Sequence, residues 1–190
     1  MDATLPLLFL DVDGPLNPWL APPHRRPRGY TTLRMRPTGW EPPRPALRVW
    51  LNPDHGPLLM GLGFRLVRAT TWRTEASTWI APVLGLPELP ALDWPEMHRR
   101  DPDGVHWNPP PSSQGAGGTP TLVEAAAGRP FAWVDDEIGP PDLTWIARHH
   151  PGPALPHRVD PADGLLPDDF ATLRKWAADH APGTSRGQGP

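Results

Sequence analysis

The chain has 190 residues, no cysteine and a formal net charge of −3. Its length is sufficient for one α/β domain with a sizeable core. The absence of cysteine excludes disulfides, thiolate zinc sites and cysteine nucleophiles, and the slight acidity gives no global basic field for nucleic acid or an anionic membrane. No apolar run has the length of a bilayer span or a secretory signal, so we expect a soluble cytoplasmic protein.

The first predicted element is a buried strand that ends in two carboxylates. The apolar run Leu7-Leu8-Phe9-Leu10 has strand length and is followed directly by Asp11-Val12-Asp13-Gly14. Because the chain turns at the carboxyl end of a strand, Asp11 and Asp13 can converge there, and Gly14 relieves the turn. Converging carboxylates repel each other unless a cation or a shared proton neutralises them. The pattern therefore predicts a hard-metal site, with Mg²⁺ as the favoured ion.

The Asp-x-Asp-Gly motif also occurs in calcium loops and in ordinary turns. An EF-hand loop requires glycine at its sixth position and glutamate at its twelfth, but counting from Asp11 these positions hold Leu16 and Pro22. The calcium-loop interpretation therefore fails. A solvated turn after a buried strand remains open at this point.

Residues 15–51 are punctuated by prolines that prevent any long helix over 14–29. Two short strands are predicted at 30–35 and 46–51, separated by a proline-rich turn. Together they form a hairpin, or flap, that we expect to stand over the end of the first strand.

A second strand–helix unit follows. Asn52-Pro53 begins a helix that ends at Gly61 and Gly63, and a strand is predicted over 64–69. This strand runs directly into Thr70-Thr71-Trp72. A threonine in that place is usually a helix cap. A helix over about 74–85 and a short strand over 88–92 complete the unit.

The second half of the chain repeats the alternation after a low-complexity segment. A flexible loop is predicted at about 108–120 and a helix at 121–127. The strand at 131–134 ends in Asp135-Asp136-Glu137. A helix at 143–149, a strand at 154–159, an amphipathic helix at 167–180 and a disordered tail at 181–190 follow. Alternating strands and helices predict an open, mainly parallel α/β sheet that binds ligands outside the carboxyl ends of its strands.

Three strand ends carry reactive groups that together fit phosphoryl transfer. Asp11 would be the nucleophile that forms an aspartyl-phosphate, and Asp13 would protonate the leaving oxygen and then activate water. Thr70 would hydrogen-bond a phosphoryl oxygen. Asp135, with Asp136, would complete a Mg²⁺ shell begun by Asp11 and Asp13.

This arrangement resembles the haloacid-dehalogenase-like (HAD) superfamily, in a branch related to the HAD domains of RNA-repair "Swiss army knife" proteins. The resemblance rests on the motifs at 10–18, 69–72 and 132–137, and it spans roughly residues 5 to 160. It implies a Rossmann-like three-layer sandwich in a single domain over 1–180, with the insertion at 15–51 in place of a small cap. It also implies Mg²⁺-dependent phosphatase chemistry.

The chain departs from that family at one motif. The family holds the phosphate with a lysine or arginine before the last acidic motif, whereas the only lysine here is Lys175 in the last helix. Candidate replacements are, in chain order, Arg73, Arg99, Arg100 and Arg129. Loss of this charge-assisted contact would lower the rate on the order of 10²-fold.

The substrate-binding set expected near the threonine motif consists of Thr70, Thr71, Trp72 and Arg73. Trp72 and Trp107 adjoin the site and would stack on a flat substrate group. The expected substrate is a small-molecule phosphate ester or a nucleic-acid terminal phosphate.

The sequence thus supports a Mg²⁺-dependent phosphatase as the first hypothesis. The missing lysine supports a second hypothesis, a catalytically weakened HAD-like module that binds metal, phosphate or a protein partner. A response-regulator-like phosphoacceptor is disfavoured, because that fold places its acceptor aspartate at a later strand and also needs a lysine.

Overall fold

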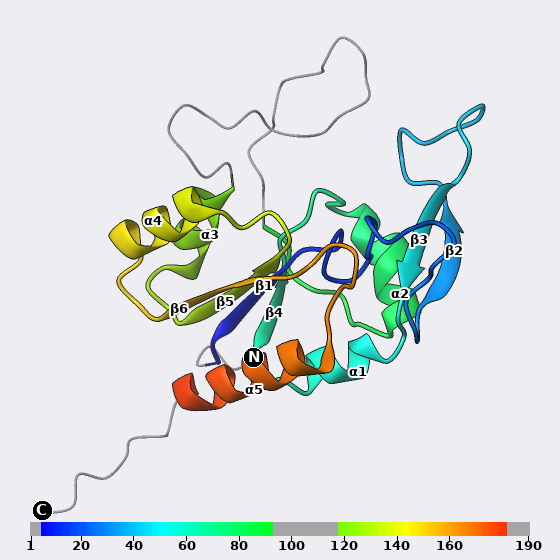
Figure 1. The fold of residues 1–190 in the computed structure, drawn as a ribbon. Coiled ribbons are helices and arrows are strands. Elements are labelled where there is room, and N and C mark those ends of the chain that lie inside the picture. Colours follow the sequence, from blue (N-terminus) through cyan, green and yellow to red (C-terminus); the bar gives the residue numbers. More distant parts are fainter. Residues whose placement is uncertain (1–4, 93–117, 182–190) are drawn as a thin grey trace, which may run out of the picture.

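The computed structural model of the protein describes residues 5–92 and 118–181 and has a parallel four-stranded sheet at its centre (Figure 1). The sheet order is β4 (Arg65–Arg68), β1 (Leu7–Leu10), β5 (Phe131–Asp135) and β6 (Ala154–Arg158). Every neighbouring pair in this sheet is parallel. The mainly parallel α/β sheet expected from the sequence is confirmed.

Side chains of the sheet alternate between two cores. Leu8 and Leu10 of β1 belong to one core, which includes residues of α1 (His55–Met60), the paired helix η1–α2 (Ala76–Ile80 and Ala81–Leu84) and α5 (Pro167–His180). Leu7 and Phe9 belong to the other core, with residues of α3 (Thr119–Ala126) and α4 (Pro140–His149). This period of two on a central strand produces three layers, with helices on both faces of the sheet.

The segment after β1 contains a separate antiparallel hairpin of β2 (Thr31–Met35) and β3 (Leu47–Leu51). Its buried face contributes Met35, Val49 and Leu51 to the first core. Figure 1 shows the hairpin beside α2, on the far side of the molecule from α4. The predicted hairpin is confirmed, with each strand beginning one residue later than expected.

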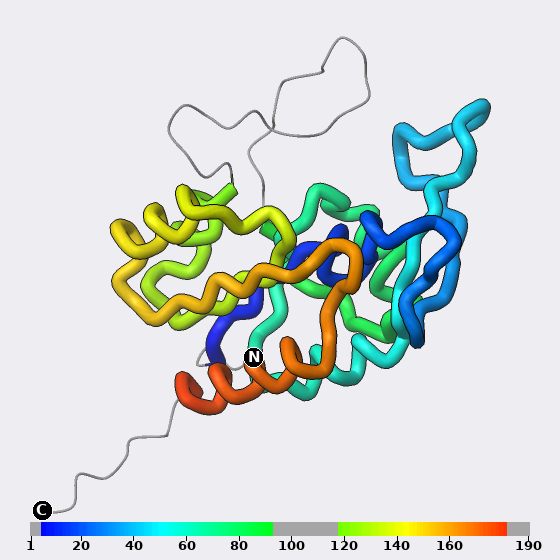
Figure 2. Tube along the Cα trace, viewed as in Figure 1, coloured from blue at the N-terminus to red at the C-terminus, as the bar shows by residue number. Residues whose placement is uncertain are grey.

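The connection that follows β6 runs back beside the segment that follows β1. In Figure 2 the orange tube before α5 approaches the blue tube after β1. Two backbone hydrogen bonds join them: the amide of Leu165 donates to the carbonyl of Pro15 at 2.9 Å, and the amide of Leu20 donates to the carbonyl of Pro161 at 3.1 Å. The first and last connections of the sheet therefore support each other.

Several predicted boundaries were wrong. The strand expected at 88–92 is reduced to a single parallel bridge between Ala91 and Arg68, because prolines at 87 and 90 have no amide to donate. Helix α3 begins at Thr119 and α4 at Pro140, earlier than expected, because proline is tolerated in a first helical turn. The helix expected at 74–85 contains a π-helical turn, η1, just before Pro82, which cannot donate to the carbonyl of Thr78.

The tail predicted over 181–190 and the loop predicted over 108–120 lie mostly outside the described residues. Within the two described ranges, none of the helices combines the length and apolarity that a bilayer crossing requires.

Candidate functional site

The topology brings three strand ends to one edge of the sheet. The chain leaves β1 for β4 on one side and later returns to β5 on the other, so the strand order reverses at β1. The parallel ladder continues past the strand ends: the amide of Asp11 donates to the carbonyl of Val134 at 3.1 Å, and the amide of Ala69 donates to Leu10 at 2.9 Å. Such a switch point is where open α/β sheets bind their ligands.

Asp11, Asp135 and Asp136 form a compact acidic cluster at this edge. One carboxylate oxygen from each residue lies within 4.8 Å of the others. Asp136 is buried, and Asp11 and Asp135 are partly buried. Three convergent carboxylates are the donor set that suits a hard divalent cation, so these residues fit Mg²⁺.

Backbone amides and tryptophan N–H groups orient the acidic cluster. The amide of Val12 donates to Oδ1 of Asp11 at 2.7 Å. Asp135 accepts hydrogen bonds from the amide of Glu137 at 2.8 Å and from Nε1 of Trp133 at 3.2 Å. These donors hold the carboxylates of Asp11 and Asp135 in place but bring no positive charge to the cluster.

Asp13, which the sequence also nominates as a metal ligand, is not a member of the acidic cluster. Both of its side-chain oxygens accept hydrogen bonds, Oδ1 from Nδ2 of Asn17 at 2.7 Å and Oδ2 from Nε1 of Trp72 at 2.8 Å. The side-chain oxygen of Asn17 in turn accepts the amide of Trp50 on β3 at 3.0 Å. Asp13 is therefore held as a positioned carboxyl group next to the cluster.

The turn after β1 depends on the glycine at position 14. Gly14 has a φ of +86°, and a Cβ atom there would lie 2.5 Å from Cγ of Asp136. Only glycine combines this left-handed backbone with so close an approach of the β5 end. The Asp-x-Asp-Gly motif therefore brings the loops after β1 and β5 into contact.

Burial raises the pKa values of all four acids, and the charges of neighbouring carboxylates raise those of Asp11, Asp135 and Asp136 further. Burial is the first cause for Asp11, whose pKa lies well above its usual value, and the charges of Asp135 and Asp13 raise it further. Burial also raises the pKa of Asp135 to about 7. Burial raises the pKa of Asp13 and of Asp136, although hydrogen bonds from Asn17 and Trp19, respectively, oppose these shifts. Without a cation, the site retains protons that free carboxylates would lose.

The threonine motif divides into a buried and an exposed part. Thr70 is buried, its hydroxyl is hydrogen-bonded to the Asp11 carboxylate and lowers the pKa of that group, and it accepts the amide of Trp72 at 3.3 Å. Thr71 and Arg73 are exposed. Arg73 has a φ of +48°, and its carbonyl accepts a hydrogen bond from Arg68 at 3.3 Å. Thr70 and Trp72 therefore belong to the site as built, and Thr71 and Arg73 lie at its exposed margin.

The expected replacement for the missing lysine is not found at the nucleophile. Among the described residues, no arginine or lysine forms an ion pair with Asp11, Asp13, Asp135 or Asp136. Arg129 donates to the carbonyl of Leu5, before the start of β1 and thus at the opposite end of the sheet. Arg129 is therefore removed as a candidate. Arg99, Arg100 and Trp107 lie outside the described residues.

Two residues at the site were missed by the sequence analysis. Arg158, the last residue of β6, pairs with Asp135 in the sheet register, and its Nε donates to the carbonyl of Asp136 at 2.9 Å. Trp19 is 47 % exposed, and its Nε1 donates to Oδ2 of Asp136 at 3.3 Å. Arg158 is a cationic residue at the carboxyl end of a strand, and this position could have indicated its place at the site. Two prolines occur in the five residues before Trp19, and no pattern in the sequence around it indicates a role at the site.

Comparisons of the chain with protein-family models, with curated proteins and with solved structures found no match.

Proposed function

We propose that the protein is a Mg²⁺-dependent phosphohydrolase that acts through an aspartyl-phosphate. The observation that carries this proposal is the meeting of Asp11, Thr70 and the Asp135–Asp136 pair at one edge of a parallel sheet. It combines a nucleophile, a hydroxyl donor and further carboxylates for a cation. The order of the three motifs along the chain supports membership of the HAD superfamily, with the β2–β3 hairpin as a small cap.

The chemistry would proceed in two steps. A carboxylate oxygen of Asp11 attacks phosphorus, the ester P–O bond breaks, and the leaving oxygen takes the proton that Asp13 carries. Water then attacks the phosphorus of the aspartyl-phosphate, Asp13 accepts a proton from that water, and phosphate leaves Asp11. The raised pKa of Asp13 supports its role as the proton donor, because a carboxyl group with an ordinary pKa is ionised at neutral pH.

Other residues would orient the phosphate. The hydroxyl of Thr70 lies beside Asp11 and can donate to a phosphoryl oxygen. Asp11, Asp135 and Asp136 would hold Mg²⁺, which neutralises the charge between an anionic nucleophile and an anionic substrate when it is bound. The substrate class that this arrangement supports is a phosphate monoester, either a small molecule or a nucleic-acid terminal phosphate.

The direct test is hydrolysis of p-nitrophenyl phosphate by the purified full chain. We expect release of nitrophenolate with millimolar Mg²⁺ and none with EDTA, and activity that returns when Mg²⁺ is restored. If the protein hydrolysed none of a broad panel of phosphate esters in the presence of Mg²⁺, the phosphatase proposal would be refuted.

A second function is favoured by the absence of an ion-paired cation at Asp11 within the described part of the chain. Without that cation, the same carboxylates would act as a metal- and phosphate-binding module with little or no turnover. Stabilisation of the protein by Mg²⁺ without hydrolysis of any ester would support this alternative over the first.

Arg158 provides the first mutational prediction. Its hydrogen bond to the Asp136 carbonyl places a guanidinium group on the loop that bears the acidic cluster. We expect Arg158→Gln to lower kcat/KM about ten-fold, because a charge-assisted contact to the phosphoryl group in the transition state would be lost. Arg148→Gln on the outer helix α4 is the matched control and should have no effect. Equal kinetics for both variants would exclude Arg158 from the site.

Trp19 provides a second prediction, on substrate affinity. Its exposed indole stands beside Asp136, so an aromatic leaving group can pack on it. We expect Trp19→Ala to raise KM for an aryl phosphate about five-fold, since one aromatic contact contributes about 1 kcal/mol. Trp19→Phe should restore most of this loss. Trp145→Ala on α4 is the control, and an unchanged KM in Trp19→Ala would contradict the assignment.

A further inference from the structure

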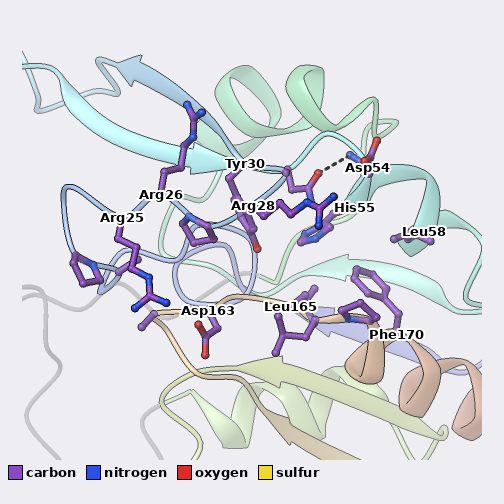
Figure 3. A pocket seen from close by; sticks show the side chains of 18 of the residues that line it. Arg25, Arg26, Arg28, Tyr30, Asp54, His55, Leu58, Asp163, Leu165 and Phe170 are labelled. Carbon is purple, nitrogen blue, oxygen red and sulfur yellow. Dashed lines mark hydrogen bonds between the residues drawn. The ribbon is translucent and has the colours of Figure 1, made fainter.

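The described residues form a cavity of about 970 Å³ that is separate from the acidic cluster. Its walls come from the segment at 21–30, the start of α1, the connection at 162–167 and the first half of α5. None of the four site aspartates, nor Thr70, lines it. In Figure 3, Arg25 and Asp163 lie toward one end of this cavity and Phe170 toward the other.

The lining of the cavity is basic in a chain whose net charge is negative. Four arginines contribute to it, Arg25, Arg26, Arg28 and Arg174, against two acids, Asp54 and Asp163. All four arginine residues are exposed, and none forms an ion pair with a described carboxylate. Guanidinium groups that no carboxylate neutralises are available to an anion.

The inner wall of the cavity is aromatic and apolar. Tyr30, His55 and Phe170 are each at least nine-tenths buried, and their rings form a chain of edge contacts with centroid distances of 5.4 and 5.2 Å. Leu165 extends this wall. Burial lowers the pKa of His55 to about 4, so its imidazole is neutral at pH 7 and adds no charge.

Two polar atoms in this wall have no hydrogen-bond partner among the described residues. They are Nδ1 of His55 and the hydroxyl of Tyr30, both buried. Buried polar atoms are nearly always paired, so these two are exceptions within the described residues. Neither atom has accessible surface, so the contribution of this wall to the cavity is apolar.

We infer that this cavity binds an organic phosphate, with its phosphate at the arginines and its apolar part against Leu58 and Leu166. Arginine is the residue that matches phosphate oxygens with paired N–H donors. The volume is far larger than a phosphate ion needs and lies within the range of sites for complete small ligands. Leu58 and Leu166 also line the cavity and are 39 % and 48 % exposed, so they offer apolar surface to the organic part of the ligand. This inference does not depend on the proposed catalytic function.

The test uses nucleoside monophosphates as probes of this ligand class. Binding of AMP and UMP to the full chain is measured by isothermal titration calorimetry in EDTA, which removes divalent cations from the acidic cluster. We expect saturable binding of at least one nucleotide, and at least ten-fold weaker binding of inorganic phosphate and of the corresponding nucleoside. Arg28→Gln combined with Arg174→Gln should weaken binding at least ten-fold, since two charge-assisted contacts are removed.

Two control variants separate this site from the acidic cluster. Asp11→Asn and Arg148→Gln should bind the nucleotide as the unchanged protein does. Because the two arginines that are replaced are exposed, circular dichroism should show that the double variant remains folded. No saturable binding at millimolar nucleotide, equal binding by the arginine variant, or loss of binding in Asp11→Asn would each overturn the inference. Equal affinity for inorganic phosphate would overturn the role of the apolar lining.

Discussion

Asp11→Asn should lower the rate of phosphate-ester hydrolysis on the order of 10⁴-fold while making the metal-free protein more stable. The rate falls because an amide cannot attack phosphorus, and removal of a nucleophile has effects of at least this order. Asparagine has the shape of aspartate, and its side-chain oxygen can still accept the hydrogen bond that Val12 donates to Oδ1. The loss is therefore chemical and not a consequence of disturbed packing.

The gain in stability has the opposite origin. In the metal-free protein, burial and the charges of Asp135 and Asp13 make ionised Asp11 unfavourable and raise its pKa. A neutral side chain removes this repulsion, so we expect the free energy of unfolding to increase by about 1 kcal/mol at pH 7. Urea denaturation in EDTA measures the stability, and p-nitrophenyl phosphate hydrolysis in Mg²⁺ measures the rate.

A matched aspartate controls for the loss of a carboxylate. Asp168 is exposed in the first turn of α5 and is not a member of the acidic cluster. Asp168→Asn should leave the rate unchanged and should not stabilise the protein. If Asp11→Asn retained more than a tenth of the activity, Asp11 would not be the nucleophile.

Metal-free protein should lose stability as the pH rises from about 4 to about 7, and Mg²⁺ should restore it only at the upper end. Ordinary aspartates in the unfolded chain have a pKa of about 3.9. In the folded protein the pKa of Asp135 is raised to about 7, and the pKa of Asp11 is also raised. The folded state thus binds more protons than the unfolded state in this window, so the free energy of unfolding falls with increasing pH.

The size of this loss should reach a few kcal/mol across the window, since each unit of pKa difference corresponds to about 1.4 kcal/mol. Mg²⁺ binds the ionised carboxylates of the folded state. At a concentration one hundred times its dissociation constant it should therefore return about 2.7 kcal/mol at pH 8 and much less at pH 5. The experiment is urea denaturation at several pH values, with Mg²⁺ and with EDTA.

Asp135→Asn isolates the contribution of the acidic cluster to this behaviour. The variant should be less sensitive to pH between 4 and 7 in EDTA and should gain little from Mg²⁺. Stability that is flat over this range in the unchanged protein, or a gain from Mg²⁺ that is equal at pH 5 and pH 8, would contradict both the repulsion and the metal site.

The core of the site was predictable because it depends on local patterns at strand ends. An apolar strand followed by carboxylates identified Asp11 and Asp135, and parallel strands necessarily bring such ends to one edge. The part of the site that could not be predicted depends on tertiary contacts. The hydrogen bonds from Asn17 and Trp72 hold Asp13 outside the acidic cluster, and they come from a loop and a different strand end. No spacing along the chain encodes that competition.

The errors in the predicted fold occur at prolines. Helices α3 and α4 begin two and three residues before their predicted starts, because proline is tolerated in a first helical turn. The strand predicted over 88–92 is reduced to one bridge with Arg68, because prolines interrupt the pairing. The predicted alternation of strands and helices is nevertheless confirmed, because the continuous apolar run of β1 and the long amphipathic face of α5 are strong signals.

The central position of β1 has a consequence for the order in which the protein matures during synthesis. Leu7 pairs with Arg65 on one side and with Phe131 on the other. Strand β1 therefore completes its pairing only when two segments far along the chain are present. Pairings of this range close large loops and form late. During synthesis Asp11 therefore meets the repulsion of Asp135 only after β5 has left the ribosome and paired with β1. Ambient Mg²⁺ would then act on the last stage of folding, when the strand ends first come together.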